Sequence, residues 1–127
     1  MDTTRIFNSA EFFQPTDGEP IRSVIATSPA AVIVAWYIQP HQEIPAHIHP
    51  QGQDTWTVLS GTGEYYLDRA GTTKSIHIGD VVIAPVGCVH GVVNLSDDDP
   101  LIFISVVSPG DAGYQLVKDF GAVVTEL

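Results

Sequence analysis

Turn residues interrupt the apolar stretches of this chain about every eight to twelve positions, and this spacing limits its fold more than any other feature. The stretches are short and rich in Val, Ile, Tyr and Thr, and breaks such as Gln39-Pro40 and Gly79-Asp80 separate them. No long helical period is present, although Ser9–Phe13 could form one helical turn. The pattern predicts an all-β sandwich or barrel. The predicted strands are Ile21–Thr27, Ala31–Gln39, Glu43–His49, Gln53–Ser60, Gly63–Arg69, Thr72–Ile78, Val81–Pro85, Cys88–Asn94 and Leu101–Val107.

Length and charge narrow the class of protein. A chain of 127 residues suits a single core, and we expect an N-terminal extension over 1–20, a barrel over 21–108 and a C-terminal tail over 109–127 that packs on the barrel or on a dimer partner. A net charge of −10 would repel a nucleic-acid backbone. The longest apolar run, residues 30–38, is about half of the roughly 20 residues that a membrane helix needs. We therefore expect neither nucleic acid nor a membrane as a partner.

The N-terminal stretch and the cysteine content indicate a compartment. Residues 1–5 are polar and acidic in character, and no apolar signal segment follows them, so we expect a cytoplasmic protein. Cys88 is the single cysteine, which excludes a disulfide within the chain and fits a reducing compartment.

Three histidines carry the clearest chemical signal. His47 and His49 are two residues apart, and because side chains alternate along a strand, both rings point to one face about 7 Å apart at the backbone. Two imidazoles so placed can converge on one metal ion at roughly 2.0–2.2 Å each. Asp54 on the following strand could add an oxygen ligand, and a barrel would bring His90 beside the pair. Taken alone, a buried histidine is more often a hydrogen-bonded core residue than a ligand.

Two motifs between His41 and Asn94 resemble those of the cupins. The first is His47-Ile48-His49, four residues, Asp54, six residues and Gly61, and the second is Gly79, five residues, Pro85-Val86-Gly87, two residues, His90, three residues and Asn94. The resemblance implies a double-stranded β-helix, or jelly-roll, barrel. It also implies a metal on His47, His49, His90 and the residue at position 54, and a homodimer formed through exposed strands.

The sequence departs from the family pattern at two positions. His41 stands where the family often has a glycine, six residues before the first histidine. Asp54 stands where the family places a glutamate, and its carboxylate reaches about 1.5 Å less far, so either the strand lies closer or a water fills the gap. Counting from His49 would select Gln53 instead. Asp54 is favoured, because a carboxylate binds a divalent cation more strongly than an amide does.

Residues around this group have less specific interpretations. Trp56 and Val58 should face inward with Asp54, and Trp36, Tyr66 and Phe103 could join them in lining a pocket, although core packing is the simpler interpretation of these side chains. Cys88 could share the face of His90, but a small buried side chain is favoured. Gly61 and Gly87 suit turns with unusual backbone angles, and Asn94 should tie loop backbone by hydrogen bonds. His41 and His77 should lie near loops or solvent, and no Lys or Arg is evident at the barrel mouth.

Several functions remain compatible with this pattern. The first hypothesis is an enzyme that acts on a small organic substrate at a divalent transition metal, with dioxygenation at Fe(II) favoured and Mn, Ni, Zn or Cu as the other metals. The alternative is a non-catalytic module or sensor that binds a small molecule or a metal. A third is a metal-free protein that uses His47 or His90 as an acid or base. We expect a homodimer that pairs through residues 31–38 and the apolar tail.

Overall fold

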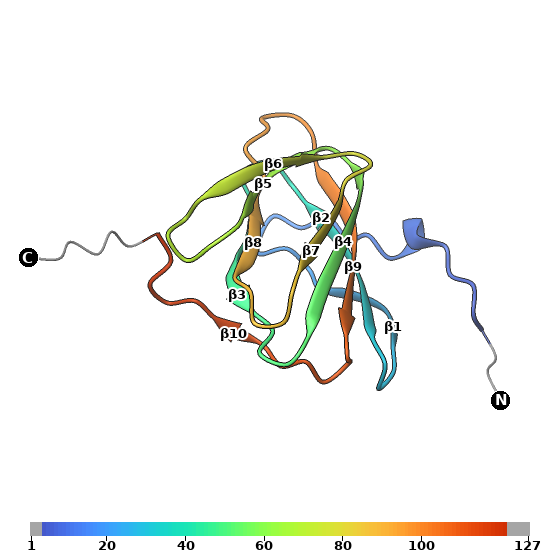
Figure 1. Cartoon of the computed structure of the whole chain (residues 1–127). Coiled ribbons are helices and arrows are strands. Elements are labelled where there is room, and N and C mark those ends of the chain that lie inside the picture. The colour runs from blue at the N-terminus through green and yellow to red at the C-terminus, as the bar shows by residue number, and fades with distance from the viewer. Residues whose placement is uncertain (1–3, 122–127) are drawn as a thin grey trace, which may run out of the picture.

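Two five-stranded antiparallel sheets lie face to face in the computed structural model, which describes residues 4–121 (Figure 1). One sheet has the strand order β1-β2-β9-β4-β7 and the other β10-β3-β8-β5-β6. All nine predicted strands are present, with ends that differ by a few residues, and the predicted turn near the N-terminus is the short 3-10 helix η1. The elements are η1 (Ser9–Glu11), β1 (Ser23–Thr27), β2 (Val32–Ile38), β3 (Glu43–Ile48), β4 (Gln53–Ser60), β5 (Thr62–Tyr66), β6 (Thr73–His77), β7 (Val81–Ala84), β8 (His90–Val93), β9 (Leu101–Ser108) and β10 (Gln115–Leu116).

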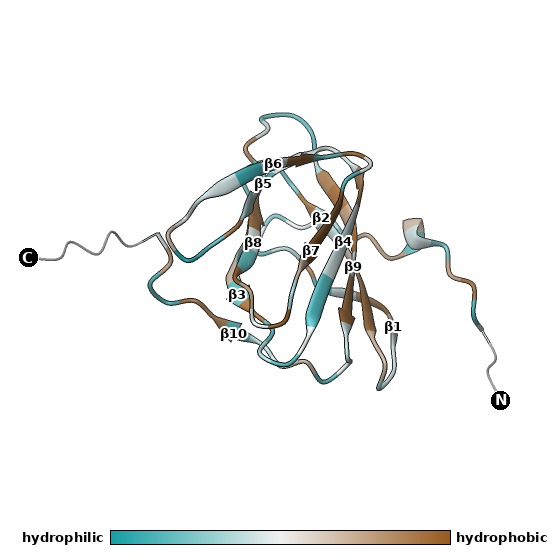
Figure 2. Cartoon of the chain, in the orientation of Figure 1, coloured by the Kyte–Doolittle hydropathy of each residue, from teal (hydrophilic) through white to brown (hydrophobic). Residues whose placement is uncertain are grey.

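The hydrophobic core lies between the two sheets. Figure 2 shows that hydrophobic residues are concentrated on the strands and hydrophilic residues on many of the connecting loops. Phe103 stacks on Trp56 with ring centroids 4.1 Å apart, and Tyr65 from the opposite sheet meets the Trp56 ring edge-on at 5.2 Å. Burial of such side chains is the main force that holds two sheets together. The buried core cluster comprises Ile38, Ile44, Trp56, Val58, Tyr65, Ile76, Val92, Leu101 and Phe103.

Part of each terminal segment contacts the barrel. The carbonyl oxygen of Thr16 accepts hydrogen bonds from the side-chain amides of Gln39 and Gln42, at 2.6 and 2.7 Å. At the other end, β10 pairs with β3, so the tail continues a sheet of its own barrel, as the lower edge of Figure 1 shows. The apolar residues 122–124 of the predicted tail lie outside the described residues. No helix within residues 4–121 has the length and apolar character that crossing a bilayer requires.

The outer face of the sheet β1-β2-β9-β4-β7 carries several apolar side chains. Ile83 on β7 is 55% exposed, and Ile104 on β9 is partly buried with its side chain on the same outer face. The expected dimer pairing through residues 31–38 stays a prediction. β2 lies between β1 and β9 and is hydrogen-bonded on both sides, so such pairing would use the face of this strand and not a free edge.

Candidate metal centre

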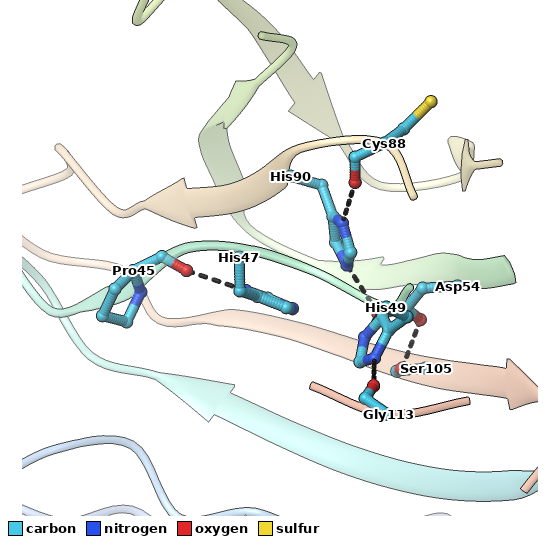
Figure 3. A network of polar contacts seen from close by, with 8 residues as sticks. All are labelled: Pro45, His47, His49, Asp54, Cys88, His90, Ser105 and Gly113. Carbon is cyan, nitrogen blue, oxygen red and sulfur yellow. Dashed lines mark hydrogen bonds and ion pairs between the residues drawn. The ribbon is translucent and has the colours of Figure 1, made fainter. Parts of the chain in front are cut away.

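Three strands bring the four predicted ligands together. His47 lies on β3 directly opposite His90 on β8, His49 follows the end of β3, and Asp54 lies near the start of β4 in the facing sheet. One possible ligand atom from each residue lies within 4.8 Å of those of the other three. Figure 3 shows the side chains of His49, Asp54 and His90 directed toward one another beside the ring of His47. The group can hold a metal ion.

An irregularity in β3 aims these histidines. Ile44 pairs with Val92 and His47 pairs with His90, so β3 has one residue more than β8 between the two pairs. This β-bulge accommodates Pro45, whose missing N–H would interrupt a regular ladder. Gly91 lies against the bulge, where an added Cβ would be 2.7 Å from the carbonyl oxygen of Ile44. The close approach of the two strands therefore depends on a glycine at position 91.

The tautomers of the three histidines suit metal binding. Each Nδ1 lies within hydrogen-bond distance of a backbone carbonyl: Pro45 for His47 at 2.8 Å, Gly113 for His49 at 2.7 Å and Cys88 for His90 at 3.0 Å. A carbonyl oxygen only accepts, so each Nδ1 carries a proton and donates. The Nε2 lone pairs are then free to bind a cation, and the carbonyls fix the orientation of the rings, as in known metal centres.

Asp54 reaches the histidines despite its short side chain. Its Oδ2 lies 3.0 Å from Nε2 of His90 and 3.3 Å from Nε2 of His49, while its Oδ1 accepts a 2.6 Å hydrogen bond from the hydroxyl of Ser105 on β9. Gln53 is exposed, and its amide donates to the hydroxyl of Thr55 at 3.2 Å. The alternation of β4 thus directs Asp54, and not Gln53, toward the histidines.

The charges of the group follow from burial and from these hydrogen bonds. Burial would raise the pKa of Asp54, but hydrogen bonds from His49, His90 and Ser105 hold it well below its ordinary value, so the carboxylate is ionised. Burial, with the nearby charge of His90, lowers the pKa of His47 to about 4. Burial also opposes protonation of His49, yet the hydrogen bonds to Asp54 and to the Gly113 carbonyl, together with the charge of Asp54, outweigh burial and raise the pKa of His49. A buried, ionised carboxylate beside His47, whose burial keeps its imidazole neutral above about pH 4, is a setting that favours a cation.

A cavity of about 910 Å³ opens onto His47, His49 and Asp54. Its volume suits a small organic molecule. The expectation of a mouth without Lys or Arg is wrong: Arg22, just before β1, lines this cavity, because the N-terminal segment runs beside it. The other lining residues are Gly18, Glu19, Pro20, Val32, Trp36, His41, Gln42, Glu43, Ile44, Pro45, Trp56, Ser105, Val107, Gly110, Ala112, Gly113, Tyr114 and Leu116.

The pocket predictions are confirmed in part. Trp36 and Trp56 line the cavity, and Val58 is buried as expected. Phe103 and Tyr66 are wrong as lining residues, because Phe103 lies in the core and Tyr66 packs against Phe120 with ring centroids 4.5 Å apart.

The cysteine does not take part in the metal centre. The preference for a buried Cys88 is wrong, because the residue is exposed in the turn before β8. Figure 3 shows its thiol directed away from the ring of His90, so it does not join the ligands either. The extended backbone that places His90 on the inner face begins only after this turn.

The loop predictions are confirmed. The side chain of Asn94 donates to the carbonyl oxygens of Ile38 and Asp99, at 3.0 and 2.9 Å. His41 is exposed at the edge of the cavity, and its φ of 68° is the left-handed conformation that a glycine adopts readily. This explains why the family often has glycine there. His77 is also exposed.

Sequence reasoning missed two further residues beside the ligands. Ser105 has the same strand parity as the buried residues Leu101 and Phe103 on β9, so the sequence could have indicated a hydroxyl at an inward position. Tyr114 lies with its ring 5.0 Å from that of His47, and the segment that carries it pairs with β3 only through the two residues of β10. A strand so short has no readable pattern.

Comparisons with known proteins agree with this geometry. The family model described as the cupin domain matches residues 34–107. The structure of a double-stranded β-helix protein from Klebsiella pneumoniae is 47% identical, with a TM-score of 0.86 over 91% of this chain and 98% of that one. Protein L612 of Acanthamoeba polyphaga mimivirus is 30% identical over 71% of this chain, and the auxin-binding protein ABP19b of Prunus persica is 32% identical over 66%. This chain spans 57% and 41% of the lengths of these two relatives.

Proposed function

The chain belongs to the cupin domain family, and on that premise we propose that it is an enzyme acting on a small organic substrate at a divalent transition metal held by His47, His49, Asp54 and His90. Dioxygenation is the favoured reaction. One observation carries the proposal: all three Nδ1 atoms donate to backbone carbonyls, so three Nε2 atoms and one carboxylate are available to a single cation beside an open cavity.

The donor set supports a metal of intermediate hardness. Imidazole and carboxylate ligands suit Fe, Mn, Ni, Zn or Cu, and no thiolate is directed at the group, because Cys88 is exposed. A bound Fe(II) would supply a place where O₂ and the substrate meet and would activate both. The protein positions the substrate in the cavity and keeps the ligands oriented through Ser105 and the backbone carbonyls.

Elemental analysis of purified protein tests the metal. We expect about one transition metal per chain in the parent and almost none in His47→Ala or His90→Ala. His77→Ala is the matched control, because His77 is exposed on β6 and does not line the cavity. A parent protein that does not bind added metal would contradict the proposal. It would favour the alternative in which a metal-free protein uses His47 or His90 as an acid or base.

Oxygen consumption tests the reaction. Iron-loaded parent, incubated with a panel of small chelating organic compounds, should consume O₂ with at least one of them, and His90→Ala should not. Uptake of metal and compounds without any turnover would favour the non-catalytic alternative, in which the protein acts as a sensor or binding module. The name of the peach relative, which refers to binding, is the observation on the side of that alternative.

A further inference from the structure

Among the described residues that line the cavity, Arg22 is the only Lys or Arg. It comes from the segment just before β1, and Glu19 of the same segment lines the cavity with it. The chain has five Lys and Arg residues against fifteen Asp and Glu. Positive charge is therefore scarce in this chain, and Arg22 places one such charge where a molecule bound in the cavity can reach it.

The guanidinium of Arg22 has no protein partner among the described residues. Arg69, by contrast, pairs with Asp119 at 2.6 Å. No hydrogen bond or ion pair of the Arg22 side chain is formed within residues 4–121, although Glu19 and Glu43 also line the cavity. A guanidinium offers five donors in a planar fork that matches a carboxylate. Arg22 is an exposed residue at the cavity, and its donors are not engaged by a carboxylate of the described residues.

Arg22 also lies near enough to the metal centre to act on the same small molecule. Arg22 lines the same cavity as the ligands His47, His49 and Asp54. Apolar side chains also line the cavity, with Val32, Trp36 and Val107 among them. The cavity therefore combines a cationic residue, a metal-binding group and apolar surface.

We propose that the substrate is a small organic acid, whose carboxylate binds Arg22 while oxygen atoms at its other end reach the metal centre. This inference rests on the proposed function and names its substrate class. Arg22 is a specificity-determining residue in this assignment, and binding of metal does not depend on it.

Binding of matched hydroxamates to nickel-loaded protein tests the proposal. A hydroxamate group chelates the metal at one end, and the other end carries either a carboxylate or the neutral carboxamide, with two to four methylene groups between them. Titration calorimetry is carried out on the parent, Arg22→Gln, Arg22→Lys and Lys74→Gln, after metal content has been measured for each. Lys74→Gln is the matched control, because it removes the same charge from an exposed position on β6 outside the cavity.

In the parent and in Lys74→Gln, at least one carboxylate probe should bind about tenfold tighter than its carboxamide. The preference should fall to near unity in Arg22→Gln and be intermediate in Arg22→Lys, with metal content unchanged in all four. A metal-loaded parent that does not prefer the carboxylate probe overturns the role of Arg22, and so does a preference that Arg22→Gln retains. Neither result contradicts the proposed metal function. A parent that takes up no metal overturns the proposed function and, with it, the two-point binding proposed here.

Discussion

Acidification of the metal-free protein should destabilise the fold through His47. The pKa of this imidazole is about 4 in the folded protein and 6.5 in an ordinary setting, because burial and the neighbouring His90 disfavour its charge. At about 1.4 kcal/mol for each pKa unit, the difference corresponds to about 3.5 kcal/mol. His47 is 5% exposed, so solvent screening takes little from this figure.

The sign follows from proton binding. Between pH 6.5 and 4 the unfolded chain binds a proton at position 47 that the folded chain does not, so the free energy of unfolding falls as the pH falls through this window. His49 acts in the opposite direction: its pKa is raised, so its contribution is fully present below 6.5 and is lost as the pH rises through its folded value. Asp54, whose pKa is lowered, loses its contribution only below its ordinary value of 3.8.

Two measurements separate these contributions. Long-range ¹H–¹⁵N spectra of the imidazoles should show His47 protonated on Nδ1 and neutral until the pH approaches 4. Urea unfolding between pH 7 and 4.5 should show a fall in unfolding free energy that the variant His47→Gln lacks, because glutamine does not titrate. A midpoint for His47 near 6.5, or the same pH dependence in parent and variant, would refute the assignment of a buried neutral imidazole.

The remaining predictions concern the support of the ligands, the bulge and the outer face. Ser105→Ala removes the 2.6 Å hydrogen bond to Asp54 and should weaken metal affinity about tenfold in a competition assay with a chelator. Ser75→Ala should leave the affinity unchanged, because Ser75 is exposed on β6. Gly91→Ala should lower the unfolding free energy by about 2–3 kcal/mol in urea, because the new Cβ would be 2.7 Å from backbone, whereas Gly18→Ala meets nothing within 4 Å and should change it little. We propose that the outer face of the sheet β1-β2-β9-β4-β7, with its exposed Ile83, joins two copies of the chain. Sedimentation should then give a dimer for the parent and a monomer for Ile83→Lys. A monomeric parent would contradict this proposal.

The fold was predictable because its signals are local. Each strand carries its own alternation and each break its own Gly, Pro or Asp, so the nine strands follow without knowledge of their partners. The bulge at Pro45 was not predictable in this way, because it exists only relative to the register of β8. The pairing of β10 with β3 and the interior place of β2 are likewise properties of the assembled sheets.

The site, like the fold, has residues that local sequence predicts and residues that only the tertiary structure brings together. The spacing of His47 and His49 and the second motif around His90 identify three of its residues, because strand parity is a local property. That Asp54 reaches the histidines depends on how close the facing sheets lie, which no motif encodes. Arg22 belongs to a segment outside every motif, and only the path of the N-terminal extension beside the cavity brings it there.

The metal-free arrangement explains why this group of residues should select a metal over protons. Every Nδ1 already donates to a carbonyl, so a close contact between an Nε2 and the carboxylate of Asp54 requires a cation between them. A proton could bridge Oδ2 of Asp54 and Nε2 of His49 or His90. Protonation of His47 as well is opposed by burial and by the neighbouring imidazoles. One divalent ion would be held by the three imidazoles and the carboxylate of Asp54 together and would need no proton on any Nε2 atom. The same burial that lowers the pKa of His47, and so costs stability in acid, therefore keeps its lone pair available to a metal at neutral pH.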